Sequence, residues 1–162
     1  MKEGYKLEIV TRFKKIRKID EIACMIEKQL SSDTKINSKH TITKSLKIAL
    51  RKGSRCTLFL LRQDAALVAF AFSNTCSGIE SGSDYLWLNE LYVEENYRKR
   101  GIGSYFIQEI EKWAINNNIV YLACITGNAN IIAQNLYEKN GFEIKDITWV
   151  DKNLLMNKDK MV

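Results

Sequence analysis

The spacing of hydrophobic residues in the first half of the chain predicts strands and helices in turn. Residues 6–11 alternate between polar and apolar side chains, as an opening strand does. Apolar residues then recur at helical spacing over 20–30 and again over 42–52. Two apolar runs at 56–61 and 67–73, joined by a short polar turn, predict a hairpin.

The second half continues this pattern of alternating elements. Residues 120–126 are almost continuously apolar, which is typical of a strand covered on both faces. The remaining elements that we expect are a loop at 74–84, a strand at 85–93, a helix at 101–117, a helix at 128–140 and a strand at 142–150 that closes the sheet. Strands early in the chain and a β-α-β unit late predict one α/β domain over residues 1–162, with a mixed sheet.

Composition excludes several classes of protein. The chain has 162 residues, of which 46% are hydrophobic and 27% charged, so it is neither disordered nor collagen-like. No apolar run approaches the roughly 18 residues that a membrane-spanning helix needs. The first residues lack the apolar block of a secretory signal. We therefore expect a cytoplasmic protein that does not associate with membranes.

Cysteine and histidine usage argues against a metal centre. The four cysteines are far apart, no Cys-x-x-Cys pair occurs, and His40 is the single histidine. A single histidine also weakens any mechanism that needs a Ser-His-Asp or Cys-His arrangement. We expect no metal.

The net charge of +6 favours partners that carry negative charge, either nucleic acid or a phosphorylated cofactor. Residues 31–55 hold seven Lys or Arg against one Asp. A solvated face around two amphipathic helices accounts for this stretch, so nucleic acid is an unlikely partner. An RNA-associated protein remains the alternative.

A glycine-containing basic turn follows the strand at 85–93. The residues Arg98, Lys99 and Arg100 precede Gly101 and Gly103. Free N–H groups and the helix dipole at the start of the next helix make an anion site, and both glycines allow close approach of the backbone. The spelling does not fit a Walker A loop, and Phe106 replaces the third glycine of a dinucleotide-binding motif. The alternative is that these glycines only ease a tight bend.

Two polar residues interrupt the same strand. Asn89 and Glu90 stand where a central strand should be apolar, and an unpaired buried carboxylate costs several kcal/mol. Glu90 is therefore a candidate base with a raised pKa that faces a wet cleft. Its alternative role is an ion pair with a nearby lysine.

Residues 97–104 (Tyr-Arg-Lys-Arg-Gly-Ile-Gly-Ser) resemble the core motif of the GCN5-related N-acetyltransferases (GNAT), written Arg/Gln-x-x-Gly-x-Gly/Ala. The segment from Asn130 to Phe142, which contains Tyr137 and ends in Gly-Phe, resembles the family's next motif at the expected distance. The resemblance implies a GNAT-type mixed sheet of six to seven strands flanked by about four helices. Its central parallel strands, 85–93 and 120–126, would splay apart around an acetyl-CoA core at about 85–142.

The resemblance also implies acetyl-CoA as cosubstrate and an amine as acceptor. The residues expected to bind acetyl-CoA are Leu91, Tyr92 and Val93 through their backbone, Arg98, Lys99, the turn Arg100, Gly101, Ile102, Gly103 and Ser104, and Asn130. Family members transfer the acetyl group directly. Glu90 would then be the base, the Val93 N–H would stabilise negative charge on the thioester oxygen, and Tyr137 would protonate the thiolate. Tyr137 as a plain core residue is the alternative, and Cys124 is expected to serve packing.

We therefore expect an acetyl-CoA-dependent N-acetyltransferase acting on a primary amine of a small molecule or a protein. The alternatives are a catalytically silent acetyl-CoA-binding module and an RNA-associated acetyltransferase. The sequence departs from the family pattern at Glu95, where proline is common, and at Lys99, where small residues are common. The short lysine-rich tail after Val150 suggests that the last hairpin is truncated or is completed by another chain, which makes a homodimer possible.

Overall fold

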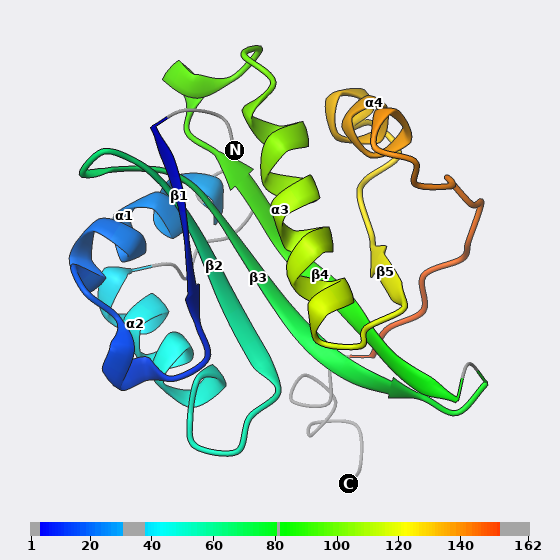
Figure 1. Ribbon diagram of the computed structural model, residues 1–162, viewed down its shortest axis with the longest axis horizontal. Coiled ribbons are helices and arrows are strands. Elements are labelled where there is room, and N and C mark those ends of the chain that lie inside the picture. Colours follow the sequence, from blue (N-terminus) through cyan, green and yellow to red (C-terminus); the bar gives the residue numbers. More distant parts are fainter. Residues whose placement is uncertain (1–3, 31–37, 81, 153–162) are drawn as a thin grey trace, which may run out of the picture.

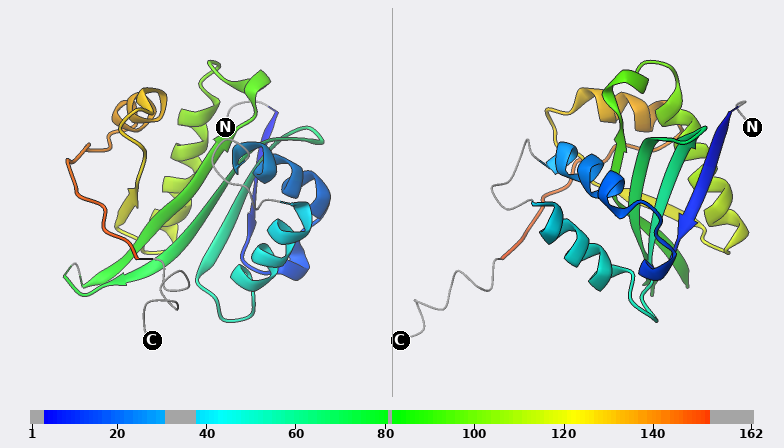
Figure 2. Two further views of the ribbon diagram at one scale, coloured as in Figure 1. Left: turned by 180° about the vertical axis from the view of Figure 1, so that it is seen from behind. Right: turned by 90° about the vertical axis from the view of Figure 1, so that its left-hand side faces the viewer.

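The computed structural model describes residues 4–30, 38–80 and 82–152. One five-stranded sheet, in the order β1-β2-β3-β4-β5, separates two layers of helices. Helices α1 and α2 cover one face, and α3 and α4 cover the other (Figures 1 and 2). No helix within these described ranges is long and apolar enough to cross a membrane.

The elements follow the predicted order. They are β1 (Tyr5–Val10), α1 (Ile19–Leu30), α2 (Lys39–Ala49), β2 (Cys56–Gln63), β3 (Ala66–Gly78), β4 (Ser83–Val93), α3 (Ile102–Asn116), β5 (Tyr121–Cys124) and α4 (Ile131–Lys139), with single 3-10 turns at Phe13–Lys15 and Glu95–Tyr97. Strands β1 to β4 pair antiparallel, and β5 runs parallel to β4. The mixed sheet, the hairpin and the four helices are confirmed.

The loop expected at 74–84 is mostly strand. The β3–β4 ladder continues outward through Cys76↔Tyr85 to Gly78↔Ser83. Arg55 supports this extension by donating to Ser77 Oγ at 2.7 Å and by pairing with Asp84. Polar side chains are compatible with a strand that extends beyond the core, because backbone pairing does not depend on an apolar face. The polar composition of residues 74–84 therefore does not distinguish a loop from a strand.

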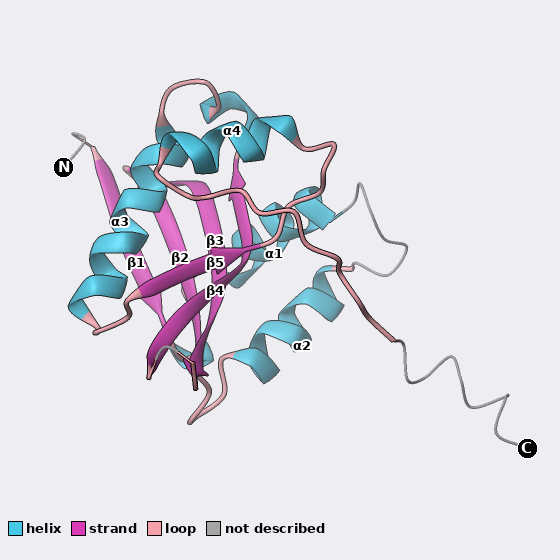
Figure 3. Cartoon of the chain, turned by 90° about the vertical axis from the view of Figure 1, so that its right-hand side faces the viewer, coloured by secondary structure: helices cyan, strands magenta, loops and turns pink. Residues whose placement is uncertain are grey.

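The expectation of six to seven strands, with one at 142–150, is wrong for the described part of the chain. The segment after α4 makes no ladder with β5 and passes it as a loop (Figure 3). A pocket of about 620 Å³ lies between this segment and β5. β5 is the edge strand of the sheet, yet residues 142–150 form no backbone pairing with it. Alternating apolar residues supply one face of a strand, but a strand also needs backbone pairing with a neighbour. Residues 153–162 of the basic tail, and residues 31–37 of the basic stretch, lie outside the described residues.

Two apolar cores hold the layers together. Phe106, Ile107 and Ile110 of α3 pack on the sheet face that carries Leu86 and Leu88. On the other face, the core is formed by α1, α2 and the sheet residues Leu58, Leu60 and Phe70. Full burial of each such side chain contributes roughly 1.5–3 kcal/mol.

A buried ion-pair network fixes α1 on the sheet. Arg62 on β2 is 7% exposed, and its guanidinium contacts Glu21 of α1 at 2.8 Å and Glu8 of β1 at 3.4 Å. The same group donates to the carbonyl of Ala65 at 3.2 Å. Because a buried guanidinium needs partners to offset its desolvation, this network fixes the orientation of α1. The far end of that helix reaches the candidate site.

Candidate active site

A bulge in β4 decides which side chains enter the site. Phe72 pairs with Glu90 and Ser73 with Leu88, so Asn89 is an extra residue opposite the ladder. Leu88 and Leu91, three positions apart, therefore both pack in the α3 core. The side chain of Glu90 is turned to the opposite face, towards α1 and α2.

Strands β4 and β5 pair only as far as Leu88↔Cys124 within the described residues. Figure 1 shows the chain beyond β5 diverging from β4. The Glu94 N–H donates to Val68 O on β3 at 2.9 Å. Because peptide groups alternate along a strand, those of Leu91 and Val93 face the open edge, whereas that of Tyr92 faces β3. The structure thus brings two of the three predicted backbone positions to the opening.

The basic turn places the start of α3 beside this open edge. Lys99 and Gly101 have positive φ values of 60° and 72°, which turn the chain sharply before Ile102 begins the helix. The bond from the Tyr105 N–H to Gly101 O, at 3.1 Å, is the first of the helix. The N–H groups of the preceding turn therefore point out of the helix, where its dipole favours an anion.

The arginines of the turn are engaged with neighbouring groups. Arg98 donates from Nε to Val93 O at 2.9 Å, and its guanidinium lies 5.1 Å from the centre of the Tyr92 ring. The Arg100 guanidinium lies 5.9 Å from the ring of Tyr97. Arg98 thus fixes the turn to the end of β4, while the exposed Lys99 adds charge beside it.

Three other predicted residues have structural roles: two lie at the contact between α3 and α4, and the third caps α4. A Cβ on Gly103 would lie 3.1 Å from Leu136 Cδ2, so the absence of a side chain accommodates α4. Ser104 Oγ accepts a hydrogen bond from Asn140 Nδ2 at 3.0 Å. Asn130 caps α4, because its side-chain oxygen accepts from the Ala133 N–H at 3.1 Å. Their roles in binding acetyl-CoA stay predictions.

Glu90 is half-buried and held by an amide. Gln29 Nε2, near the end of α1, donates to Glu90 Oε2. Burial raises the pKa of Glu90 above its ordinary value, and the hydrogen bond from Gln29 partly opposes this by lowering it. The lysine at the same helix end, Lys28, pairs instead with Glu94 at 2.9 Å. No lysine of the described residues forms an ion pair with Glu90, which leaves it as the candidate base.

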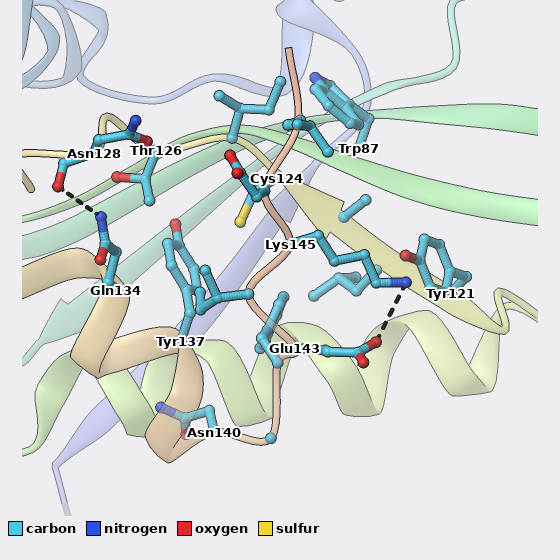
Figure 4. Close-up of a pocket in the computed structure, with 18 of the residues that line it drawn as sticks. Trp87, Tyr121, Cys124, Thr126, Asn128, Gln134, Tyr137, Asn140, Glu143 and Lys145 are labelled. Carbon is cyan, nitrogen blue, oxygen red and sulfur yellow. Dashed lines mark hydrogen bonds and ion pairs between the residues drawn. The ribbon is translucent and has the colours of Figure 1, made fainter. Parts of the chain in front are cut away.

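Tyr137 approaches from the other face of the sheet. It is 7% exposed, its ring packs 5.1 Å from that of Phe142, and its hydroxyl and the Cys124 thiol point towards one another (Figure 4). Burial raises the Tyr137 pKa far above its usual range, and the neighbouring Cys124 and Glu90 raise it further. The phenol therefore remains protonated at neutral pH. Cys124 packs against the α3 core, as expected, and it also raises the pKa of this hydroxyl.

Two pockets meet the candidate residues from opposite sides. The pocket of about 620 Å³ is lined by Tyr137, Cys124 and Trp87 together with residues 142–147 (Figure 4). A second pocket, of about 180 Å³, lies between α1, α2 and β3 and has Glu90 in its wall. Glu90 and Tyr137 therefore lie on either side of the point where β4 and β5 part.

Sequence reasoning missed Gln29. The apolar stripe of α1 runs through Ile22, Met25 and Ile26, and Gln29 occupies the next position of that stripe. A polar side chain on a buried helix face needs a polar partner. That break in the stripe was the signal that could have identified it.

Comparisons with known proteins agree with this geometry. The acetyltransferase (GNAT) family model matches residues 23–142. An aminoglycoside N(6')-acetyltransferase type 1 of Salmonella typhimurium is 25% identical over 88 residues, which cover 52% of this chain. The chain spans 61% of the length of that relative in the match.

Solved structures share the fold at low sequence identity. A possible acetyltransferase from Clostridium difficile 630 superposes with a TM-score of 0.77 at 19% identity, over 94% of this chain and 99% of that one. Aminoglycoside N-acetyltransferase AAC(6')-Iy, in complex with CoA, gives a TM-score of 0.71 at 16% identity, over 95% and 99%. With the family match over most of its length, this chain belongs to the acetyltransferase (GNAT) family.

Proposed function

We propose that this protein is an acetyl-CoA-dependent N-acetyltransferase that transfers the acetyl group directly to a primary amine. The observation that carries the proposal is the meeting of three features at one point. The open edge of β4, the N-terminus of α3, and the pair formed by Glu90 and Tyr137 all lie where β4 and β5 part.

The residues at this point suit acetyl-CoA. The N–H and carbonyl of Leu91 would pair with the amide-containing arm, as an added strand does. The N–H groups at 101–104 and the ammonium of Lys99 would bind the diphosphate. When bound, acetyl-CoA supplies a thioester, which is the electrophile of the reaction.

The two titratable groups can handle the protons of an acyl transfer. An amine with a pKa near 10.4 costs about 4.6 kcal/mol to deprotonate at pH 7. The ionised Glu90 would accept that proton, directly or through water, and its raised pKa makes it a better base than an ordinary carboxylate. Tyr137 would donate its proton to the leaving sulfur, and the second proton that the nitrogen loses as the amide forms would restore the phenol through solvent. The Val93 N–H would face the negative charge that develops on the thioester oxygen. The carbonyl of Val93 already accepts a hydrogen bond from Arg98.

The acceptor is a primary amine of a small molecule or protein. The names of relatives make aminoglycosides one class to assay. The decisive experiment combines titration calorimetry with acetyl-CoA and a thiol-release assay against a panel of amines. Saturable binding together with amine-dependent thiol release supports the proposal. Binding without acetylation of any amine would favour the silent module, and no binding would overturn the assignment of the turn.

A further inference from the structure

The pocket of about 180 Å³ lies on the side of the sheet from which an amine would reach Glu90. Its walls come from α1, α2 and β3, and Glu90 is the part of β4 that it contacts. The bulge at Asn89 is what directs Glu90 to this side, while the open edge of β4 lies towards β5. The pocket and the proposed coenzyme site therefore approach Glu90 from different directions.

The lining of this pocket is mainly hydrocarbon. Ile26 of α1, Leu46 of α2 and Phe70 of β3 are all buried side chains in its wall. Thr41 and the exposed Ser45 add hydroxyl groups from α2. Glu90 is the one carboxylate among the described residues that line it. Such a lining provides one place for an ammonium group and otherwise favours apolar atoms.

The charge of α2 points in the same direction. The helix carries Lys39, Lys44 and Lys47 and contains no acidic residue. A ligand with several ammonium groups would be repelled by these lysines and would find only one carboxylate in the wall. The hydroxyl groups of a sugar would also lose their water against Ile26 and Phe70 without gaining partners. Both effects disfavour a polycationic sugar as the occupant.

We propose that this pocket holds the apolar substituent of the acceptor, and this inference rests on the proposed function. The acceptor would be a primary monoamine that carries an aromatic or branched aliphatic group. The amine would lie beside Glu90, and the substituent would lie between α1 and α2. An apolar cavity of about 150 Å³ binds a benzene molecule. A pocket of about 180 Å³ therefore matches a group of roughly six carbons.

The test uses the full chain and three amines that differ in character: 2-phenylethylamine, ethanolamine and the aminoglycoside kanamycin. Calorimetry in the presence of CoA measures binding without turnover, and thiol release from acetyl-CoA measures transfer. We expect 2-phenylethylamine to bind at least tenfold more tightly than ethanolamine or kanamycin, and to be acetylated with the highest kcat/KM.

Two variants locate the binding. Ser45→Phe adds a ring at an exposed position of the wall. It should weaken the binding of 2-phenylethylamine at least tenfold and leave the Kd for ethanolamine within twofold. Lys44→Phe adds the same ring at the adjacent exposed position, which does not line the pocket, and should leave both within twofold. Tighter binding of kanamycin than of 2-phenylethylamine, or equal weakening of all amines by Ser45→Phe, would overturn the inference.

The outcomes also separate this inference from the proposed function. Faster acetylation of kanamycin or ethanolamine than of 2-phenylethylamine would support the proposed acetyltransferase function and contradict the apolar acceptor. The chain could instead bind 2-phenylethylamine, lose that binding in Ser45→Phe, and fail to bind CoA. That result would support the amine pocket and contradict the proposed acetyltransferase function.

Discussion

The amide of Gln29, on α1, donates a hydrogen bond to the carboxylate of Glu90, on β4, across 61 positions of sequence. This bond connects a helix that covers the sheet to the candidate base within it. It holds the carboxylate in one orientation and stabilises the charged form against the effect of burial. The ion pairs of Arg62 with Glu21 and Glu8 hold the same helix at its other end.

Replacing Gln29 by Leu removes the group that lowers the pKa of Glu90. That pKa should rise, so the acid limb of the kcat/KM profile should move to higher pH, because Glu90 must be ionised to accept a proton. Activity on the alkaline plateau should recover to within a few-fold of the original chain. Gln108→Leu, at an exposed position of α3, is the matched control and should leave the profile unchanged. An equal loss at every pH would instead mean that Gln29 is merely structural.

Glu90→Gln should lower kcat at pH 7 by about 10²–10³-fold and leave the Kd for acetyl-CoA within twofold. Residual activity should increase with pH, since the fraction of free amine then grows without help from a base. Steady-state kinetics from pH 6 to pH 10 check both points. The exposed Glu138→Gln is the control for the same substitution elsewhere. An unchanged rate would exclude Glu90 from the reaction.

Tyr137→Phe removes one hydroxyl and retains the ring that packs on Phe142. We expect kcat to fall by about 10²-fold, with coenzyme affinity retained and stability reduced by about 1 kcal/mol for the lost hydrogen bond. Because the Tyr137 pKa is raised far above neutrality, the defect should be constant between pH 6 and pH 9. Tyr5→Phe, which removes a hydroxyl bonded to Gln63 at 3.4 Å, should leave kcat unaltered.

Lys99→Glu reverses a charge at the exposed turn before α3. Repulsion of the diphosphate should weaken the binding of CoA about tenfold at low salt. The difference in affinity between the variant and the original chain should shrink in 0.5 M salt, because screening shortens the range of the charge. Calorimetry at two salt concentrations measures this. The exposed Lys52→Glu, a charge reversal remote from the turn, should leave the affinity within twofold. Equal effects of the two substitutions would contradict a local anion site.

Gly103→Val tests the contact between α3 and α4. Because even a Cβ would lie 3.1 Å from Leu136 Cδ2, the larger side chain should lower the free energy of unfolding by about 1–3 kcal/mol. Combining it with Leu136→Ala should show a favourable coupling in urea unfolding. Gly127→Val, where an added Cβ meets nothing within 4 Å, should change stability little. Additive losses in the double variant would argue against the contact.

The sequence predicted the order of the elements well because each helix buries an apolar stripe and each central strand an apolar run. It failed at 74–84, where backbone pairing and Arg55 extend two polar strands, and at 142–150, where an alternating pattern passes the edge strand β5 without pairing to it. Apolar spacing reports which face is buried. It does not report whether the backbone pairs with a neighbouring strand.

The site was predicted unevenly for the same reason. Glu90 stood out as a charge inside an apolar strand, and Gly101 as part of a turn. Gln29, the partner of Glu90, did not stand out, because their contact depends on the packing of α1 across the sheet. Gly103 was identified, but its contact with Leu136 on α4 was not, and its role in binding acetyl-CoA stays a prediction. Residue type indicates what a side chain can do, and only tertiary contacts show which group it meets.

The bulge at Asn89 sets the face of the sheet on which each later side chain of β4 lies. If Asn89 were instead paired in a regular ladder, Glu90 would enter the hydrocarbon beside Phe106 and Leu91 would turn out towards α1. Substitutions at Asn89 are tolerable in principle, because its side chain is exposed. The backbone of the bulge, rather than the side chain of Asn89, therefore keeps the carboxylate of Glu90 in the wall of the pocket between α1 and α2 while the leucines on either side stay in the core.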